Sequence, residues 1–150
     1  VVMLALLCAA ARAENERKHL VYFEMGGNAG IYSLNYDRAP FVFNQKHRLG
    51  FRLGFSWLPV QVVDYVNVCT FPVMATYIYG GSQHKLELGL GMTMRLTTTE
   101  RELTVRPSFS QAIVYRFQPV DDLFVIRIGL TPLWFDSFIP WAGLSVGRAL

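Results

Sequence analysis

Apolar and polar residues alternate without interruption from Lys85 to Thr97. Every second residue from Leu86 to Leu96 is leucine or methionine, and the residues between them are glutamate, glycine, threonine and arginine. The segment from His47 to Trp57 repeats this pattern, with leucine, phenylalanine and tryptophan on one face and arginine, glycine and serine on the other. Because successive side chains of a β-strand point to opposite faces, a period of two predicts strands with one apolar face.

The make-up of the polar face indicates which solvent each face meets. It holds glycine, serine, threonine and a few arginines or glutamates, and not the mixture of lysine, asparagine and glutamate that covers a water-washed surface. Such a small face fits a narrow lumen, so the apolar face would point outward into lipid, as in a transmembrane β-barrel. The predicted lipid-facing residues are Leu49, Phe51, Leu53, Phe55, Leu86, Leu88, Leu90, Met92 and Met94.

A soluble, lipocalin-like barrel is the alternative, in which the apolar face would turn inward around a greasy ligand. That arrangement would place glycines such as Gly50, Gly54, Gly89 and Gly91 on a water-facing surface. Glycine weakens an exposed strand, whereas in a tight lumen it leaves room for crossing arginine side chains. The pattern therefore favours the membrane barrel.

Composition agrees with strands in a bilayer. Of the 150 residues, 52% are hydrophobic and 17% are charged, yet after residue 13 no apolar run reaches the ~18 residues of a spanning helix.

Residues 1 to 13 are predicted to be a secretory signal peptide, because Ala11-Arg12-Ala13 has the small-x-small form of a cleavage site. A short buried helix, or lipidation at Cys8, is the alternative for this segment. Residues 14 to 150 then form one barrel domain.

Turn residues divide this domain into segments of similar size. Short turns are predicted at Gly80 to Gln83 and Pro119 to Asp122, and longer loops at Leu58 to Asn67, Thr97 to Thr104 and Trp134 to Pro140. Short turns on one side and longer loops on the other are typical of bacterial outer-membrane barrels, whose short turns lie in the periplasm.

Counting strands between these turns predicts an all-β fold, an eight-stranded antiparallel transmembrane β-barrel of the outer-membrane type. The predicted strands are Leu20 to Gly26, a segment ending near Arg38, His47 to Trp57, Val68 to Tyr79, His84 to Leu96, Val105 to Phe117, Leu123 to Leu133 and Trp141 to Leu150. The first hairpin turns at Gly26 to Gly30, although one long kinked strand over residues 20–38 is an alternative. Pro72, Pro107 and Pro132 fall inside predicted strands, so we expect them at bulges or strand ends.

Aromatic residues gather near the ends of the predicted strands. Amphipathic rings favour the level of the lipid headgroups, so these positions predict interfacial aromatic girdles. The predicted interfacial residues are Trp57, Tyr77, Tyr79, Trp134 and Trp141, together with Tyr22, Tyr36, Tyr115 and Phe117.

The inward positions carry an unusual number of charges. The predicted lumen charge network consists of Glu24, Asp37, Arg48, Arg52, Glu87, Arg95, Arg106, Arg116 and Arg127, with Asn28 and Asn35 on the same face. An ion removed from water needs an opposite charge and further hydrogen bonds, so the acids should bridge the arginines across the lumen. This predicts a structural plug. An anion-selective pore, or an arginine cluster that binds lipid A phosphate or carboxylate groups, are the alternatives.

Catalysis finds little support in the sequence. The histidines after residue 13 are His19, His47 and His84, all at predicted strand starts on the periplasmic side, away from the outer-leaflet level where enzymes that modify lipid A work. We expect no enzyme, no metal site and no cofactor. The formal charge of +3 is small and no basic-aromatic motif is present, so we expect no nucleic-acid binding.

Two segments carry a family resemblance. The segment from Tyr22 through Asp37-Arg38, and more loosely His84 to Gly89, resembles small, mostly uncharacterised outer-membrane β-barrel proteins of Bacteroidota. The resemblance implies residence in the outer membrane of a Gram-negative bacterium, among its lipids and lipopolysaccharide, and it implies no activity. We therefore expect a structural or accessory subunit beside a larger outer-membrane complex. The alternatives are a small pore, a lipid A-binding barrel and, less favoured, a lipid A-modifying enzyme.

Overall fold

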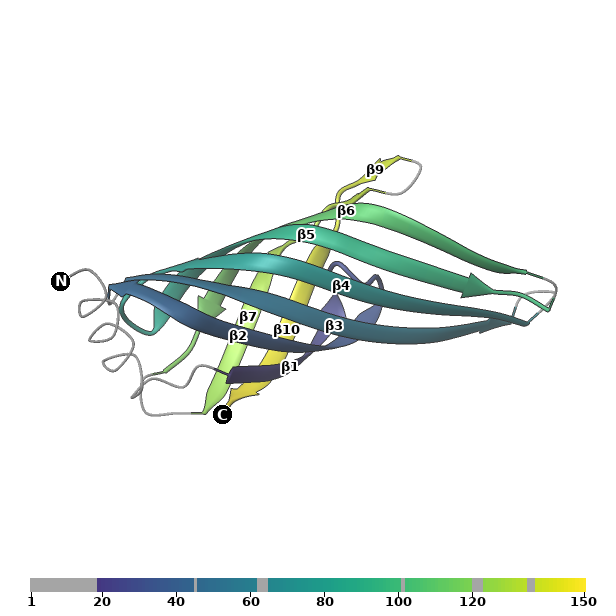
Figure 1. Ribbon diagram of the computed structural model, residues 1–150. Coiled ribbons are helices and arrows are strands. Elements are labelled where there is room, and N and C mark those ends of the chain that lie inside the picture. The colour runs from purple at the N-terminus through teal and green to yellow at the C-terminus, as the bar shows by residue number, and fades with distance from the viewer. Residues whose placement is uncertain (1–18, 45, 62–64, 101, 120–122, 135–136) are drawn as a thin grey trace.

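The fold is a closed antiparallel barrel (Figure 1). The computed structural model describes residues 19–44, 46–61, 65–100, 102–119, 123–134 and 137–150, so the predicted signal peptide lies outside the described residues. The strands in this part of the chain are β1 (His19–Gly26), β2 (Tyr32–Asn44), β3 (His47–Gln61), β4 (Tyr65–Tyr79), β5 (His84–Thr98), β6 (Leu103–Phe117), β7 (Phe124–Leu130), β8 (Leu133–Trp134), β9 (Phe138–Ile139) and β10 (Ala142–Ala149).

Eight of these strands close the barrel. Neighbours follow the order β5-β4-β3-β2-β1-β10-β7-β6, and a further pairing between β5 and β6 joins the two ends of the sheet. The remaining two strands, β8 and β9, form a small hairpin that pairs with β6 only at Ser110 and Leu133. The predicted eight-stranded antiparallel barrel is confirmed.

The first hairpin turns at Gly26 to Gly30, as predicted, and residues 20–38 do not form one long strand. Gly26, Gly27 and Gly30 have φ angles of 76°, 83° and 101°, which glycine adopts without the steric cost that a Cβ brings. The N–H of Gly26 donates to the carbonyl of Ile31 at 2.6 Å and closes the turn. The alternative of a single kinked strand is therefore wrong.

Four predicted boundaries are wrong. The loop predicted at Leu58 to Asn67 is mostly strand, because β3 and β4 pair as far as Gln61 and Tyr65. The loop predicted at Thr97 to Thr104 is shortened at both ends, because β5 and β6 pair as far as Thr98 and Leu103. The second strand, predicted to end near Arg38, continues to Asn44. The strand predicted to reach Leu133 ends earlier, since β7 stops at Leu130. Cross-strand pairing, which a single sequence does not reveal, sets these ends.

The strands form two unequal walls. Each strand of the long wall, β3 to β6, has 15 residues, whereas β1, β7 and β10 of the short wall have 8, 7 and 8. We call the end of the barrel that holds His19 and Leu150 the terminus end and the opposite one the loop end. Figure 1 shows the long wall continuing past the short wall at the loop end.

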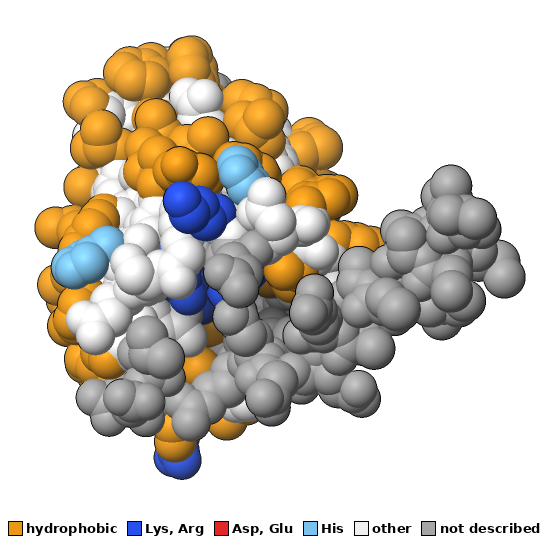
Figure 2. Space-filling model, turned by 90° about the vertical axis from the view of Figure 1, so that its left-hand side faces the viewer, with side chains coloured by type: hydrophobic (Ala, Val, Ile, Leu, Met, Phe, Trp, Pro, Cys, Tyr) orange, Lys and Arg blue, Asp and Glu red, His pale blue; other side chains and the backbone are white. Residues whose placement is uncertain are grey.

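The apolar set faces outward. Eight of the nine residues predicted to face lipid have exposed fractions between 37% for Phe51 and 59% for Leu90, and the ninth, Met94, is half-buried. Figure 2 looks at the terminus end and shows apolar side chains around much of the rim, with lysine or arginine both inside the rim and at its lower edge. A soluble barrel with an apolar lumen needs the opposite arrangement. None of the described residues forms a helix long and apolar enough to cross a membrane.

The three prolines behave differently from one another. Pro132 lies between β7 and β8, at a strand end as expected. Pro107 lies in the part of β6 that neither β7 nor β8 pairs, where a missing N–H is tolerated. Pro72 lies in the middle of β4 without a register shift, so the expectation of a bulge or strand end is wrong there. Instead the ladder to β3 is interrupted between the pairs Leu53–Val73 and Ser56–Thr70.

Candidate functional site: the filled lumen

A group of charged side chains fills the lumen near the terminus end. The central charge cluster consists of Tyr22, Asp37, Arg52, Glu87, Arg116 and Arg127, which come from β1, β2, β3, β5, β6 and β7. Each of these residues is at most 6% exposed. Alternation places them all on the inward face, so strands far apart in the sequence deliver their charges to one level of the lumen.

Glu87 is the centre of this cluster. Its carboxylate accepts a hydrogen bond from Arg52 Nη2, and its Oε1 lies 2.6 Å from Arg127 Nη2. Its Oε2 lies 3.7 Å from Arg116 Nη1. One carboxylate thus faces the guanidinium groups of three arginines that are each at most 6% exposed, which makes each contact strongly dependent on the others.

Arg52 joins Glu87 to a second acid. Its Nε donates to Asp37 Oδ1 at 3.0 Å, so a single guanidinium bridges Asp37 on β2 and Glu87 on β5 across the lumen. These contacts have the form that we expected of acids bridging arginines.

Tyr22 completes the cluster, and its position corrects the sequence prediction. Its hydroxyl donates to Asp37 Oδ1 at 3.2 Å, and its ring centre lies 4.2 Å from Arg127 Cζ and 5.5 Å from Arg52 Cζ. We expected Tyr22 in an interfacial girdle, but it is 2% exposed inside the barrel. The signal for this was present, because Tyr22 has the same parity as the inward residue Glu24.

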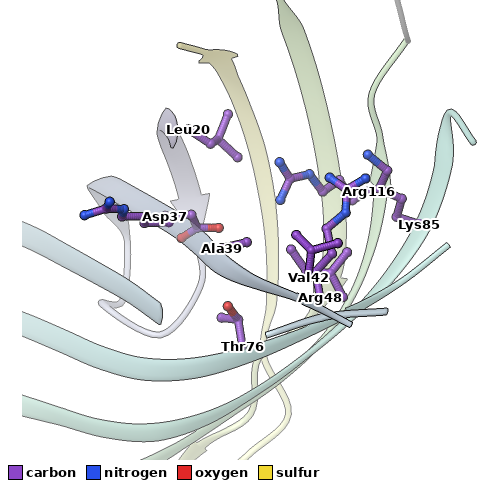
Figure 3. Close-up of a pocket in the computed structure, with 10 residues that line it drawn as sticks. Leu20, Asp37, Ala39, Val42, Arg48, Thr76, Lys85 and Arg116 are labelled. Carbon is purple, nitrogen blue, oxygen red and sulfur yellow. The ribbon is translucent and has the colours of Figure 1, made fainter. Parts of the chain in front are cut away.

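The predicted network includes four further residues. Glu24 is buried beside Ser145, whose hydroxyl donates to Glu24 Oε1 at 3.2 Å. Arg48 lies on β3 at the terminus end. Arg95 and Arg106 are paired positions of β5 and β6 near the loop end, eight and ten residues from Glu87 and Arg116 along their strands. Arg48 thus lines one pocket together with Asp37 and Arg116 of the central charge cluster (Figure 3), whereas Arg95 and Arg106 lie nearer the loop end.

Glycines give the cluster its room. A Cβ at Gly147 would lie 2.2 Å from the Cβ of Tyr22, and one at Gly54 would lie 2.2 Å from the side-chain oxygen of Asn35. A larger residue at either position would displace a buried neighbour. At these two positions the missing side chain leaves room for a buried lumen residue, whereas a Cβ at Gly50, Gly91 or Gly129 would first meet the backbone of a neighbouring strand.

The β1–β2 turn, residues 26–31, fills the lumen nearer the loop end. Asn28 and Ala29 are 4% and 7% exposed. Thr70 on β4 donates to the carbonyl of Ala29 at 3.0 Å, and Thr93 on β5 donates to that of Asn28 at 3.3 Å. The side-chain amide of Asn28 in turn donates to the carbonyl of Gln111 on β6 at 3.2 Å. The turn therefore crosses the barrel to the opposite wall.

Aromatic side chains lie near both ends of the strands. Trp134 and Phe138 pack together on the β8–β9 hairpin with ring centres 4.8 Å apart, and the indole N–H of Trp141 donates to the carbonyl of Gly30 at 3.2 Å. Trp57 is exposed on the outer face of β3, and its carbonyl accepts a hydrogen bond from Tyr32. Tyr77 and Tyr79 lie at the opposite end, with ring centres 6.0 Å and 5.1 Å from that of His47.

The three histidines begin β1, β3 and β5, and each contacts a tyrosine on the next strand. The pairs are His19–Tyr36, His47–Tyr77 and His84–Tyr115, with a ring nitrogen and the phenol oxygen in hydrogen-bond contact in every case. This arrangement ties neighbouring strands together at the terminus end. Among the described residues, no group of three or more histidine, cysteine or acidic side chains could hold a metal ion.

Comparisons with known proteins support the fold. No protein-family model and no curated protein matches the sequence. The structure of Ail, the attachment invasion locus protein of Yersinia pestis, in complex with the heparin analogue sucrose octasulfate, is similar with a TM-score of 0.54, 15% identity and coverage of 87% of this chain and 94% of that one. The N-terminal β-barrel domain of OprF from Pseudomonas aeruginosa has a TM-score of 0.52, 13% identity and coverage of 89% and 98%. The chain thus has the fold of an outer-membrane β-barrel.

Proposed function

We propose that this protein is an integral barrel of a Gram-negative outer membrane with a closed lumen, and that it serves as a structural or accessory subunit beside a larger outer-membrane complex. In this arrangement the outward apolar residues contact lipid and lipopolysaccharide, and the terminus end faces the periplasm. The membership of a Bacteroidota family stays a prediction from the sequence.

The filling of the lumen at two levels carries the proposal. An eight-stranded barrel leaves an interior just wide enough for its own side chains. Here the central charge cluster occupies one level and the β1–β2 turn occupies another. Both obstructions are held by bonds to several strands, which supports a barrel that does not conduct.

Because a closed lumen leaves no path for a solute, we place the function on the outer surface and at the two ends of the barrel. The β8–β9 hairpin offers one surface of this kind, because it pairs with the barrel at a single position and carries Trp134, Phe138 and Ile139 at 37% to 53% exposure. Aromatic residues are enriched in protein interfaces. We therefore assign contact with a larger partner to this hairpin.

Planar-bilayer recordings test the closed lumen. The purified protein should show no conductance above that of protein-free bilayers, whereas a porin added to the same chamber should show discrete steps. Stable steps from the wild-type protein would contradict the proposal and favour the small-pore alternative. Spin labels at Leu88 and Phe51 of the protein in lipid vesicles should report an acyl-chain environment, and contact with water would contradict membrane residence.

Affinity purification in mild detergent tests the accessory role. We expect a fixed larger membrane protein to copurify with the wild-type chain and to be lost from a Phe138→Ser variant. A Phe41→Ser variant is the matched control, since Phe41 is similarly exposed, at 61%, on β2 far from the hairpin. Recovery of the protein alone would remove support for the accessory role.

Binding of a polyanion is the second candidate function. Arg95 and Arg106 form a cross-strand pair at the loop end, and the similar protein Ail was solved with a polysulfated sugar. Binding of lipid A or a sulfated saccharide that is lost in an Arg106→Gln variant would support this candidate. We propose no catalytic role, and unchanged lipid A mass in a deletion strain is the expected result.

A further inference from the structure

The outer face of the barrel at the terminus end repeats one arrangement on three hairpins. The histidines that begin β1, β3 and β5 each contact a tyrosine on the next strand. In two hairpins the residue directly opposite the histidine is aromatic, with ring centres 5.1 Å and 5.4 Å apart in the pairs His47–Tyr79 and His84–Phe117. The residue opposite His19 is Arg38. The β1–β2 hairpin therefore carries a guanidinium group where the other two carry a ring.

A second arginine lies on the other side of His19. β1 lies between β2 and β10 (Figure 1), and the N–H of Leu150 donates to the carbonyl of His19 at 2.8 Å. Arg148 is paired with Val21, so it is a diagonal neighbour of His19. Directly opposite residues have Cβ atoms about 5 Å apart, and diagonal neighbours about 7–8 Å. Arg38, His19 and Arg148 thus form one group on three adjacent strands, which we call the outer basic group.

The outer basic group points away from the lumen. Arg38 and Arg148 are exposed and His19 is half-buried, and alternation along the strands places all three on the lipid-facing side. Nδ1 of His19 is in hydrogen-bond contact with the hydroxyl of Tyr36, which fixes the ring and leaves Nε2 as the nitrogen that can meet a ligand. The group therefore presents its polar atoms to whatever surrounds the barrel at this level.

The acids in the described part of the chain lie away from this face. Glu24, Asp37 and Glu87 are buried in the lumen, and Glu100 and Glu102 lie between β5 and β6 at the loop end. An anion outside the barrel is therefore the ligand that fits the charge of the outer basic group.

An apolar strip continues from the outer basic group toward the loop end. Phe23 on β1 and Val146 on β10 are paired and exposed, and Leu144 follows as a third exposed apolar residue. A molecule that lies along these strands thus meets basic side chains at its terminus end and apolar side chains beyond them. A phospholipid with an anionic headgroup has this order of charge and hydrocarbon.

From this arrangement we propose that the outer basic group binds the phosphate of an anionic phospholipid, whose acyl chain lies along the apolar strip. Guanidinium groups donate two parallel hydrogen bonds to phosphate oxygens, and basic side chains at a membrane surface attract anionic lipids. A zwitterionic phospholipid adds a cation to the same phosphate and is bound less well. This inference rests on the proposed function, which places the terminus end at the periplasmic leaflet.

Electron spin resonance of labelled lipids tests the site. The full chain is reconstituted in phosphatidylcholine vesicles with a trace of spin-labelled phosphatidylglycerol or spin-labelled phosphatidylcholine. Lipids in contact with the barrel give a motionally restricted signal, and the ratio of the two restricted fractions measures the preference. For the wild-type protein we expect about a two- to threefold preference for phosphatidylglycerol, averaged over the whole perimeter.

Three variants locate this preference. Arg38→Gln should show an intermediate ratio, and the double variant Arg38→Gln/Arg148→Gln should associate equally with both lipids. Lys46→Gln is the matched control for the single variant, because Lys46 is exposed in the β2–β3 turn at the same end and lies outside the outer basic group. It should keep the wild-type ratio. Equal urea unfolding curves for all four proteins show that the fold is unchanged.

The possible failures are distinguishable. Equal restricted fractions of the two lipids with the wild-type protein overturn the lipid site and leave the membrane barrel standing. A loss of preference in Lys46→Gln as large as that in Arg38→Gln also overturns the site, because the attraction would then follow the net charge of the whole terminus end. Absence of a restricted signal with either lipid contradicts membrane residence, and with it the proposed function.

Discussion

The two levels of the lumen are filled by different means. Near the terminus end, charged side chains from five strands and the ring of Tyr22 from a sixth meet around Glu87, and Gly147 leaves room beside Tyr22. Near the loop end, the backbone of the β1–β2 turn lies inside the barrel and is bonded to hydroxyl groups of the wall. The small buried residues around this second level are Ser33, Ser56, Thr70, Thr93, Ser110 and Thr131.

This difference shows how the size of the lumen-facing side chains determines what fills the barrel at each level. Arginine and glutamate reach across a lumen of this width, but each then needs opposite charge, and loss of one partner leaves the others buried without compensation. Serine and threonine do not reach across, so they leave space that a glycine-rich turn occupies, and each of their hydrogen bonds contributes separately. We therefore expect substitutions at the charged level to cost more than those at the turn level.

The largest expected effect is at Glu87. A Glu87→Leu substitution leaves Arg52, Arg116 and Arg127 without their shared acceptor, and we expect a loss of about 3–5 kcal/mol in the free energy of unfolding. Urea unfolding in detergent micelles, followed by tryptophan fluorescence, measures it. Glu24→Gln is the control, since glutamine keeps an acceptor for Ser145, and it should lose less than about 1 kcal/mol. Equal losses in the two variants would contradict the central place of Glu87.

The turn level should respond less, and Gly27 tests it. A Cβ at position 27 would lie 2.2 Å from Glu24 Oε2, and an alanine there would have to keep the φ angle of 83° that Gly27 adopts. Gly30 has a φ angle of 101° but no atom within 4 Å of such a Cβ, so Gly30→Ala carries the backbone strain alone. We expect about 2 kcal/mol of destabilisation for Gly27→Ala and about 1 kcal/mol for Gly30→Ala. Similar values for both would show that the turn is not packed against Glu24.

The smallest expected effect is at Thr93. Its hydroxyl bonds to the carbonyl of Asn28 and lies 2.6 Å from Ser110 Oγ, so a Thr93→Val variant should lose about 1 kcal/mol of stability. Bilayer recordings of the same variant test whether the turn alone keeps the lumen shut, and we expect it to stay closed because the charge cluster is intact. Thr98→Val, at the exposed end of β5, is the control and should change stability by less than about 0.5 kcal/mol.

Much of the fold was predictable because alternation is a local signal. The polarity of each position in β3 and β5 reports its face directly, and the glycines of the β1–β2 turn report the reversal. The ends of β3 to β6 were not predictable, since Leu58 to Asn67 reads as a loop by composition and becomes strand only through pairing. Alternation shows which residues face inward, but it does not show at which level along the barrel axis each residue lies. For this reason the sequence places Arg95 and Arg106 in one group with Glu87.

The filling of the lumen was only partly predictable. Inward charges of both signs indicated ion pairs, and Asn28 was expected inside. The sequence does not show that the backbone around Asn28 enters the barrel, because a glycine-rich turn is compatible with either side of a loop. Tyr22 lies outside the predicted girdle for a different reason, because it is near a strand end but shares the inward parity of Glu24.

The unequal walls have a consequence for the surrounding bilayer. At the usual tilt, strands of eight residues rise about 20 Å and strands of 15 residues about 38 Å, against an apolar band of about 25 Å. The hydrocarbon beside β1, β7 and β10 must then thin or the barrel must lean, each at a modest energetic cost. Because the hydrophobic mismatch is confined to the short wall, membrane proteins or lipids that relieve the thinning should gather beside β1, β7 and β10.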